Sequence, residues 1–408
     1  MFYKRLRARH VAGLAALAAA LMLVVTACSS SGGGSDADSP GGTPIVVGAM
    51  CSCTAQMTGG AFSLQPQVIQ AWVDHTNAGG GINGHPVKVI ELDDAGNPAT
   101  ALQNAKKLVQ QYKVPAILFT EVLPSAAAYL KSTETPLIGF DLTFGPYSFP
   151  SLFTVGADEW TASVAVGDIA KRAGKQKFGY MYCNPGCEQP HAMAKASAEK
   201  LGIGYFGVPI SLSQPDYVAQ CLAAKSAGAD ALEIGSNGNG VSKVAGQCAS
   251  QQYNPMLIGG AFVATKKVLN DPVLNGEKLW SSYANYQGDS TPPGAKVFSD
   301  AMQKYAGAAF NDPEFTPQYE LAWAAGQMFK AAAEAGKIKP GATADDMRRG
   351  LYALKNETLG GLIAPTTYEP GKFFRTPCYY EFTIDSGKLT GGDKPNCVDQ
   401  SVLDAITG

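Results

Sequence analysis

The sequence is poor in charged residues and in histidine, and both shortages limit its function. Only 16% of the residues are charged, and 32 Lys and Arg against 34 Asp and Glu give a formal net charge of −2. Nucleic acid is therefore not an expected partner. The chain has four histidines, and its cysteines do not form paired C-x-x-C units, so no metal site is expected. It also lacks a nucleophile elbow and a phosphate-binding loop, and no cofactor is expected.

Long apolar runs are absent after the first 27 residues. Residues 11–27 carry no charge and follow a basic head at residues 4–9, which is the pattern of a secretory signal. The segment is too short and too rich in alanine for a membrane span of about 20 residues. Val25-Thr26-Ala27-Cys28 resembles a bacterial lipobox, and this resemblance implies that Cys28 carries a lipid after cleavage at residue 27. An uncleaved anchor helix is the alternative. Both place the folded part outside the cytoplasm, at the outer face of the cell membrane.

The part of the chain after Cys28 divides into a linker and a body. Residues 28–43 are rich in Ser, Gly and Asp, and this composition is typical of a flexible linker. The body from residue 44 onward is long enough for two domains.

The cysteine count fits an exported protein. The chain has nine cysteines, and nine minus the lipidated Cys28 leaves eight, an even number. Eight cysteines allow 105 connectivities, and the sequence does not select one. The local arrangement suggests Cys183 with Cys187, Cys221 with Cys248, and Cys378 with Cys397. Cys51 and Cys53 remain, and they either form a disulfide with each other or stay reduced.

Short β-branched runs alternate with amphipathic stretches throughout the body, which predicts parallel βαβ units and an α/β fold. Strands are expected at residues 45–50, 87–92, 116–120 and 137–140, and the alternation restarts after residue 150 with strands at 178–182, 205–210, 231–235 and 256–259. Later segments predict helices at 293–305, 317–335 and 344–354 and a last strand at 378–383. Ligands of open parallel sheets bind beside the loops that follow the strands, so these loops are the candidate site.

Several motifs, in order, resemble the leucine/isoleucine/valine-type solute-binding proteins. They are Val47-Gly48-Ala49-Met50, the segment NAGGGING at 77–84, Asp93-Asp94, Pro136-Leu137-Ile138 and Ile258-Gly259. The resemblance implies a periplasmic-binding-protein type I fold, with two Rossmann-like lobes, parallel central sheets and a three-segment hinge. The lobes would comprise residues 44–148 plus 286–364 and residues 149–285 plus 365–408.

The same resemblance implies a function without catalysis. A monomer would close around a small organic solute and deliver it to an ABC permease and its ATPase. A ligand-sensing receptor component of the same fold is one alternative. A hydrolase that uses Glu121 and Asp141 as a general acid/base pair is another.

The candidate ligand-binding residues lie in the expected loops. They are Gln56, Met57, Thr58, Thr120, Glu121, Asp141, Thr143, Trp160, Asn184, Ser236, Asn237, Ala261 and Phe262. By resemblance, Thr143 matches a hydroxyl ligand and Met57 an aromatic contact, although a loop-capping threonine and a core methionine fit these positions too. Ala261 stands where the family commonly has a glutamate that pairs with the ligand ammonium, so an ordinary branched-chain amino acid is not expected. Glu121 and Asp141 instead favour a neutral or zwitterionic solute, amino-acid-like, amide or aromatic, with an apolar part near Trp160 or Phe262. Each acid alone also fits a solvated loop.

Overall fold

The computed structural model describes residues 40–55, 62–140 and 148–407. They belong to one compact unit, Asp38–Gly408. The expected signal segment, Cys28, most of the linker and five candidate ligand residues (Gln56, Met57, Thr58, Asp141 and Thr143) lie outside the described residues. None of the helices in the described ranges is sufficiently long and apolar to cross a membrane.

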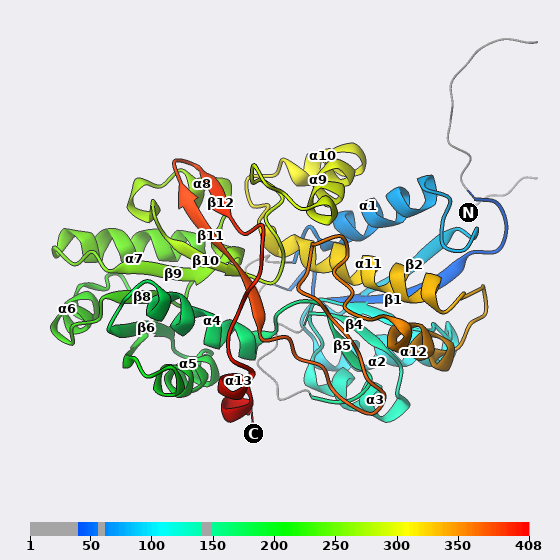
Figure 1. Cartoon of the computed structure of the whole chain (residues 1–408), viewed down its shortest axis with the longest axis horizontal. Coiled ribbons are helices and arrows are strands. Elements are labelled where there is room, and N and C mark those ends of the chain that lie inside the picture. Colours follow the sequence, from blue (N-terminus) through cyan, green and yellow to red (C-terminus); the bar gives the residue numbers. More distant parts are fainter. Residues whose placement is uncertain (1–39, 56–61, 141–147, 408) are drawn as a thin grey trace, which may run out of the picture. The chain divides into compact units, whose positions relative to one another are not determined.

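The first sheet is fully parallel, with strand order β2-β1-β3-β4-β5 (Figure 1). Its strands are β1 (Ile45–Cys51), β2 (Val87–Asp93), β3 (Ile117–Phe119), β4 (Leu137–Gly139) and β5 (Leu152–Thr154). The helices between them are α1 (Gln65–Ala78), α2 (Pro98–Lys106), its π-helical continuation η2 (Lys107–Gln111) and α3 (Pro124–Thr133). β5 lies beyond the expected lobe boundary at residue 148, and its three buried residues pair with β4 in this sheet.

The second sheet has eight strands, five of them parallel. The parallel strands are β6 (Lys177–Cys183), β7 (Gly204–Ile210), β8 (Ala231–Ile234), β9 (Met256–Gly260) and β10 (Lys278–Ser281). The antiparallel ones are β11 (Cys378–Asp385), β12 (Lys388–Gly391) and β13 (Asn396–Cys397). The sequence suggested only parallel sheets. The hairpin arises because Ser386 and Gly387, with φ of 50° and 86°, form the two-residue turn that joins β11 to β12.

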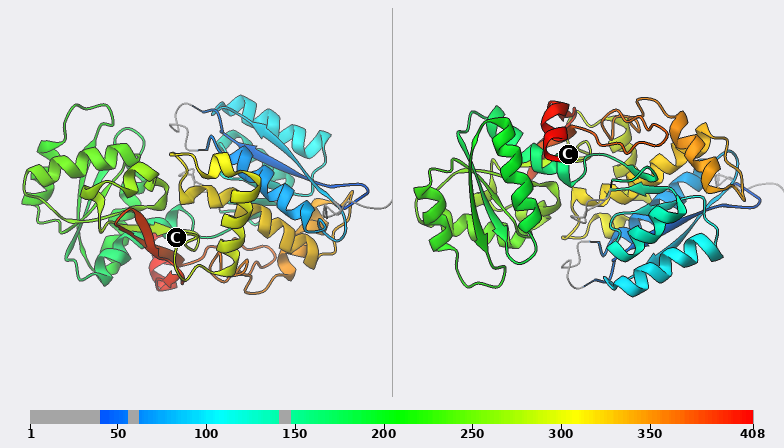
Figure 2. Two further views of the ribbon diagram at one scale, coloured as in Figure 1. Left: turned by 90° about the horizontal axis from the view of Figure 1, so that it is seen from above. Right: turned by 90° about the horizontal axis from the view of Figure 1, so that it is seen from below.

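Helices lie on both faces of the second sheet (Figure 2). They are α4 (Glu159–Arg172), α5 (Glu188–Leu201), α6 (Val218–Ser226), α7 (Gly238–Ser250), η3 (Ala261–Val263), α8 (Lys266–Leu269) and η4 (Pro272–Leu274). α4 and α5 pack with Phe178 and Tyr180 of β6, whereas α6 and α7 pack with Met181 and with Ile234 of β8. This alternation reflects the two-residue repeat of a strand.

The later helices return to the first sheet. They are α9 (Pro293–Tyr305), α10 (Gly307–Phe310), η5 (Pro317–Tyr319), α11 (Glu320–Ala335) and α12 (Ala344–Ala353), and α13 (Gln400–Thr407) follows at the C-terminal end. α9 and α11 pack against α1, and α12 packs against α11. Trp72 of α1 is fully buried, and a Cβ at Gly326 of α11 would lie 2.5 Å from its indole. Glycine is needed there because the two helices approach so closely.

Three chain segments connect the two sheets, and hydrogen bonds join these segments to one another. The Tyr283 hydroxyl donates to the Val155 carbonyl at 2.8 Å, and the Tyr368 hydroxyl donates to the Thr154 carbonyl at 2.7 Å. The Ala284 N–H donates to the Leu362 carbonyl at 2.9 Å. Both tyrosines are almost completely buried, so the connection is a packed layer and not three independent loops.

The described residues contain four disulfides. They join Cys183 to Cys187, Cys221 to Cys248 and Cys378 to Cys397, the pairs that the local arrangement suggested, and also Cys51 to Cys53. The Cys221–Cys248 bond connects α6 to α7.

Candidate functional site

Three polar residues meet at the carboxyl end of the first sheet, because each follows a different strand. Ser52 follows β1, Asp94 follows β2 and Glu121 lies just beyond β3. The Ser52 hydroxyl donates to Asp94 Oδ1 at 2.7 Å, and the Gly96 N–H donates to the same oxygen at 2.8 Å. Asp94 is 1% exposed. Asp94 Oδ2 and Glu121 Oε2 are buried and have no hydrogen-bond partner among the described residues.

The electrostatics of these two carboxyl groups depend on burial and on each other. Burial raises the pKa of Glu121, the charge of Asp94 raises it further, and the hydrogen bond from Ser52 opposes the shift. Burial also raises the pKa of Asp94. Two neighbouring carboxyl groups with free oxygens are suited to a cation, or to a ligand group that donates hydrogen bonds.

Thr120 is placed next to this cluster but is bonded within the protein. Its hydroxyl donates to the side-chain carbonyl of Gln65, at the start of α1. The Gln65 amide donates to the Met50 carbonyl at 3.4 Å and to Glu91 Oε1 at 3.3 Å. Burial raises the pKa of Glu91 to about 7. Thr120 and Gln65 therefore fix the ends of β1 and β3 relative to α1.

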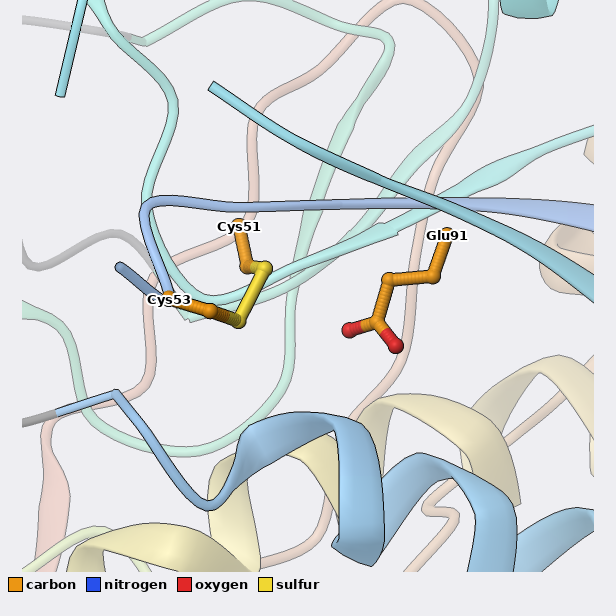
Figure 3. A group of neighbouring side chains, drawn as sticks. All are labelled: Cys51, Cys53 and Glu91. Atoms are coloured by element: carbon orange, nitrogen blue, oxygen red, sulfur yellow. A yellow bond between two sulfur atoms is a disulfide. The ribbon is translucent and has the colours of Figure 1, made fainter. Parts of the chain in front are cut away.

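Glu91 also lies beside the Cys51–Cys53 disulfide, with its carboxyl group on the same side of the strands (Figure 3). One potential ligand atom from each of the three residues lies within 4.8 Å of the others. The two sulfur atoms are bonded to each other, so neither is a thiolate that holds a metal ion.

The carboxyl end of β9 in the second sheet presents an aromatic side chain. Phe262 is 42% exposed although it is large and apolar, and its ring meets the Trp280 ring edge-on with centroids 6.4 Å apart. Ala261 is buried beside it. Exposed aromatic side chains at strand ends are typical ligand contacts.

The remaining second-sheet candidates have structural roles. Asn237 caps α7, because its side-chain oxygen accepts the Gly240 N–H at 3.0 Å, and Ser236 directly precedes it. Asn184 lies in the turn closed by the Cys183–Cys187 bond, and its N–H donates to the Ile210 carbonyl at 2.9 Å.

Trp160, near the start of α4, lies under the Arg375 guanidinium, 5.6 Å from the ring centroid. Arg375 Nε also donates to Asp158 Oδ2 at 2.5 Å. Trp160 is thus covered by an internal cation. Arg375 was not predicted, because it lies more than 200 residues further along the chain and no local pattern marks it.

The structure therefore brings together Thr120 and Glu121 at the first sheet and Ala261 and Phe262 at the second. Sequence reasoning missed Ser52, Gln65 and Asp94 as site residues. Asp94 had a signal, since it is part of the Asp93-Asp94 motif after a predicted strand. Gln65 had no such signal, because its segment has only the pattern of an amphipathic helix.

Comparison with known structures supports the fold. Similar chains include a fatty acid ABC transporter substrate-binding protein from Thermomonospora curvata, with a TM-score of 0.68, 17% identity, and coverage of 90% of this chain and 95% of that one. A leucine-binding protein from Thermotoga maritima has a TM-score of 0.64 and 15% identity, with 85% and 97% covered. An ABC transporter solute-binding protein from R. palustris in complex with benzoate has a TM-score of 0.62 and 18% identity, with 88% and 98% covered. All three show the same α/β fold with parallel central sheets.

Comparison with curated protein sequences finds no match to this chain. The family model described as periplasmic binding protein matches residues 44–388, which is nearly the whole body. The chain therefore belongs to the periplasmic binding protein family.

Proposed function

We propose that the protein captures a small organic solute between the carboxyl ends of its two sheets and delivers it to an ABC permease and its ATPase. The observation that carries this proposal is the Ser52, Asp94 and Glu121 cluster, where two buried carboxyl oxygens have no partner among the described residues. Buried polar atoms normally have a partner, and a ligand would supply it. The protein makes and breaks no bond, and closure around the ligand draws on the binding free energy.

The ligand has two parts in this proposal. A hydroxyl, amide or ammonium group donates to Asp94 and Glu121, and an apolar or aromatic part contacts Phe262. A ligand whose only polar group is a carboxylate would meet like charge at the first sheet. An amino acid held only by its α-ammonium and carboxylate would lack the second-sheet acid that Ala261 replaces. The named relatives bind leucine, benzoate or a fatty acid, so the family accommodates chemically different ligands.

The cellular arrangement is part of the same proposal. Cleavage before Cys28 and lipidation of its sulfur would tether the protein to the outer face of the membrane through the linker. The two lobes, one built on the first sheet with β5 and the other on the second sheet, would act as a monomeric clamp.

The test begins with the ligand that co-purifies with the protein. It is released by denaturation, identified by mass spectrometry and added back in a thermal-shift assay, together with leucine, valine and benzoate as comparison compounds. A ligand at 100 times its Kd stabilises the folded state by about 2.7 kcal/mol. We expect the largest shift for a compound that carries a hydrogen-bond donor and an apolar part and is not an ordinary branched-chain amino acid.

Variants test whether the Ser52, Asp94 and Glu121 cluster binds the ligand that causes the thermal shift. Glu121→Gln removes the negative charge at nearly constant volume, and we expect it to weaken binding at least tenfold. Glu314→Gln, an exposed glutamate before α11, is the matched control and leaves binding unchanged. A largest shift with leucine or valine, or unchanged binding by Glu121→Gln, would contradict the proposed ligand class. Chemical turnover of the ligand would contradict the proposed function.

A further inference from the structure

A pocket of about 200 Å³ opens at the end of the second sheet away from the candidate site. It lies at the amino ends of β9 and β10, whereas Phe262 follows the carboxyl end of β9. The last turns of α7, the start of β9 and the segment after η4 form its walls. Most of the lining is apolar, including Ala245, Ala249, Tyr253, Met256 and Val273.

One carboxyl group lines this apolar pocket. Glu277 is 3% exposed, and its Oε2 is buried without a hydrogen-bond partner in the described part of the chain. Its backbone is fixed on both sides, because its N–H donates to the Leu274 carbonyl and its carbonyl accepts from the Ile384 N–H, both at 3.0 Å. The side chain is also confined, since a Cβ at Gly259 would lie 3.0 Å from Glu277 Oε1. The carboxyl group is thus held in a defined position.

No cation among the described residues pairs with the Glu277 carboxyl group. Lys278, the next residue, turns its ammonium to Glu381, at 3.5 Å, and to the Thr383 hydroxyl, at 2.8 Å. The other charged side chain that influences the group is Glu233 of β8, which has the same sign. Burial raises the pKa of Glu277 to about 8, and the charge of Glu233 acts in the same direction. An isolated buried carboxyl group is destabilising unless something pairs with it.

We propose that this pocket is a second binding site, distinct from the solute site, and that it takes a small protonated amine with a short apolar chain. The ammonium group would donate to Glu277 Oε2, and the hydrocarbon would cover Met256 and Val273, which is exposed at the rim. A metal ion would find only one carboxyl ligand among the lining residues. A volume of about 200 Å³ suits a chain of a few carbon atoms.

The test uses n-butylamine as the probe and n-butanol as its uncharged match, with binding to the purified full protein measured by titration calorimetry. We expect n-butylamine to bind and n-butanol to bind at least tenfold more weakly. Glu277→Gln should weaken amine binding at least tenfold, whereas Glu199→Gln, an exposed glutamate on α5, should not change it. Ala249→Leu fills the pocket from α7 without altering the carboxyl group and should weaken amine binding as well.

Other results would overturn the second site. These are no detectable amine binding, equal binding of the amine and the alcohol, or unchanged amine binding in both Glu277→Gln and Ala249→Leu. Amine binding that is lost in Glu121→Gln but kept in Glu277→Gln would place the probe at the proposed solute site instead. Because Glu277→Gln should bind the co-purified solute normally, failure of this inference is separate from failure of the proposed function.

Discussion

Glu320, the first residue of α11, is a carboxyl group without an evident ligand. It is fully buried, and neither side-chain oxygen has a hydrogen-bond partner among the residues that the structure describes. Tyr283, Tyr286 and Tyr380 lie close enough for its charge to raise the pKa of each phenol. Burial raises the pKa of Glu320 itself well above its usual range. Burial therefore favours the neutral form of this side chain, and its two oxygens, which lack a partner in the described part of the chain, lower the stability of the protein.

Replacing Glu320 by methionine, which is of similar length, should increase the free energy of unfolding. Removing a buried polar group that lacks a partner gains about 1–3 kcal/mol. The raised pKa makes the gain pH-dependent. Below the unfolded pKa of about 4.5, Glu320 is protonated in both states, and its titration does not lower stability. As pH rises above this value, Glu320 ionises in the unfolded state, and the free energy of unfolding of the wild type falls. Urea unfolding should thus show a larger gain at pH 8 than at pH 5.

The control for this variant is again Glu314→Gln, since Glu314 is exposed and lies in the segment just before α11. It should leave the unfolding curve unchanged at both pH values. Destabilisation by Glu320→Met at pH 8 would show that Glu320 has a partner that stabilises its charge.

At the second sheet, Phe262→Ala should weaken solute binding about tenfold with little effect on stability. The reason is that Phe262 is 42% exposed, and a ligand that contacts it would cover this remaining apolar area. Leu212→Ala, which truncates another exposed apolar side chain, is the matched control. Titration of the co-purified ligand and thermal unfolding measure the two effects. A large drop in the melting temperature without loss of affinity would make Phe262 a packing residue.

At the scale of elements, the two disulfides Cys221–Cys248 and Cys51–Cys53 should have different effects. The first closes a sequence separation of 27 residues between α6 and α7, and the second a separation of 2 residues at the end of β1. A cross-link stabilises more when it closes a longer loop. Replacing Cys221 and Cys248 by serine should lower the free energy of unfolding by about 3–4 kcal/mol.

Replacing Cys51 and Cys53 by serine should lower stability by less, about 1 kcal/mol on the same loop-length argument. Ser52, which bonds to Asp94, lies between the two cysteines, so this variant should weaken ligand binding more than the Cys221/Cys248 variant does. Chemical denaturation and ligand titration of both variants separate the effects. Equal loss of stability in the two variants would contradict the loop-length argument.

The sequence predicted most of the parallel strands, including the three-residue strands β3 and β4, but it missed β5 and β10. Residues 45–50 and 178–182 are continuous apolar runs of the kind that parallel sheets require, and β1 and β6 lie there. β5 and β10, with three and four residues, were missed. Site residues were predicted only where the local sequence marked them. Glu121 and Phe262 were found because they directly follow predicted strands, whereas Gln65 and Arg375 gain their roles only through tertiary contacts.

At the scale of the whole molecule, the buried glutamates should make the protein less stable as pH rises. Burial raises the pKa of Glu91 to about 7 and the pKa values of Glu233 and Glu277 to about 8. Between the unfolded pKa of about 4.5 and these values, the folded state holds more protons than the unfolded state, so stability falls with rising pH. Each group contributes at most about 1.4 kcal/mol per pH unit.

The histidines act in the opposite direction only at lower pH. Burial lowers the pKa of His75 and of His191, so their effect on stability develops below about pH 6.5. Urea unfolding between pH 6.5 and 8 should therefore show a steady decrease in the free energy of unfolding, and Glu277→Gln should reduce the slope. A constant or increasing stability over this range would mean that these carboxyl groups are already ionised in the folded state.

The bonded tyrosine layer that connects the two sheets would have to accommodate closure. Tyr283 and Tyr368 bond to neighbouring carbonyls, of Val155 and Thr154, so the crossing segments are expected to move together. Small-angle X-ray scattering of the purified protein, with its co-purified ligand removed and then restored, tests this account most directly. The account predicts a smaller radius of gyration with ligand in the wild type and no change in Glu121→Gln at the same ligand concentration. An identical scattering curve with and without saturating ligand in the wild type would contradict it.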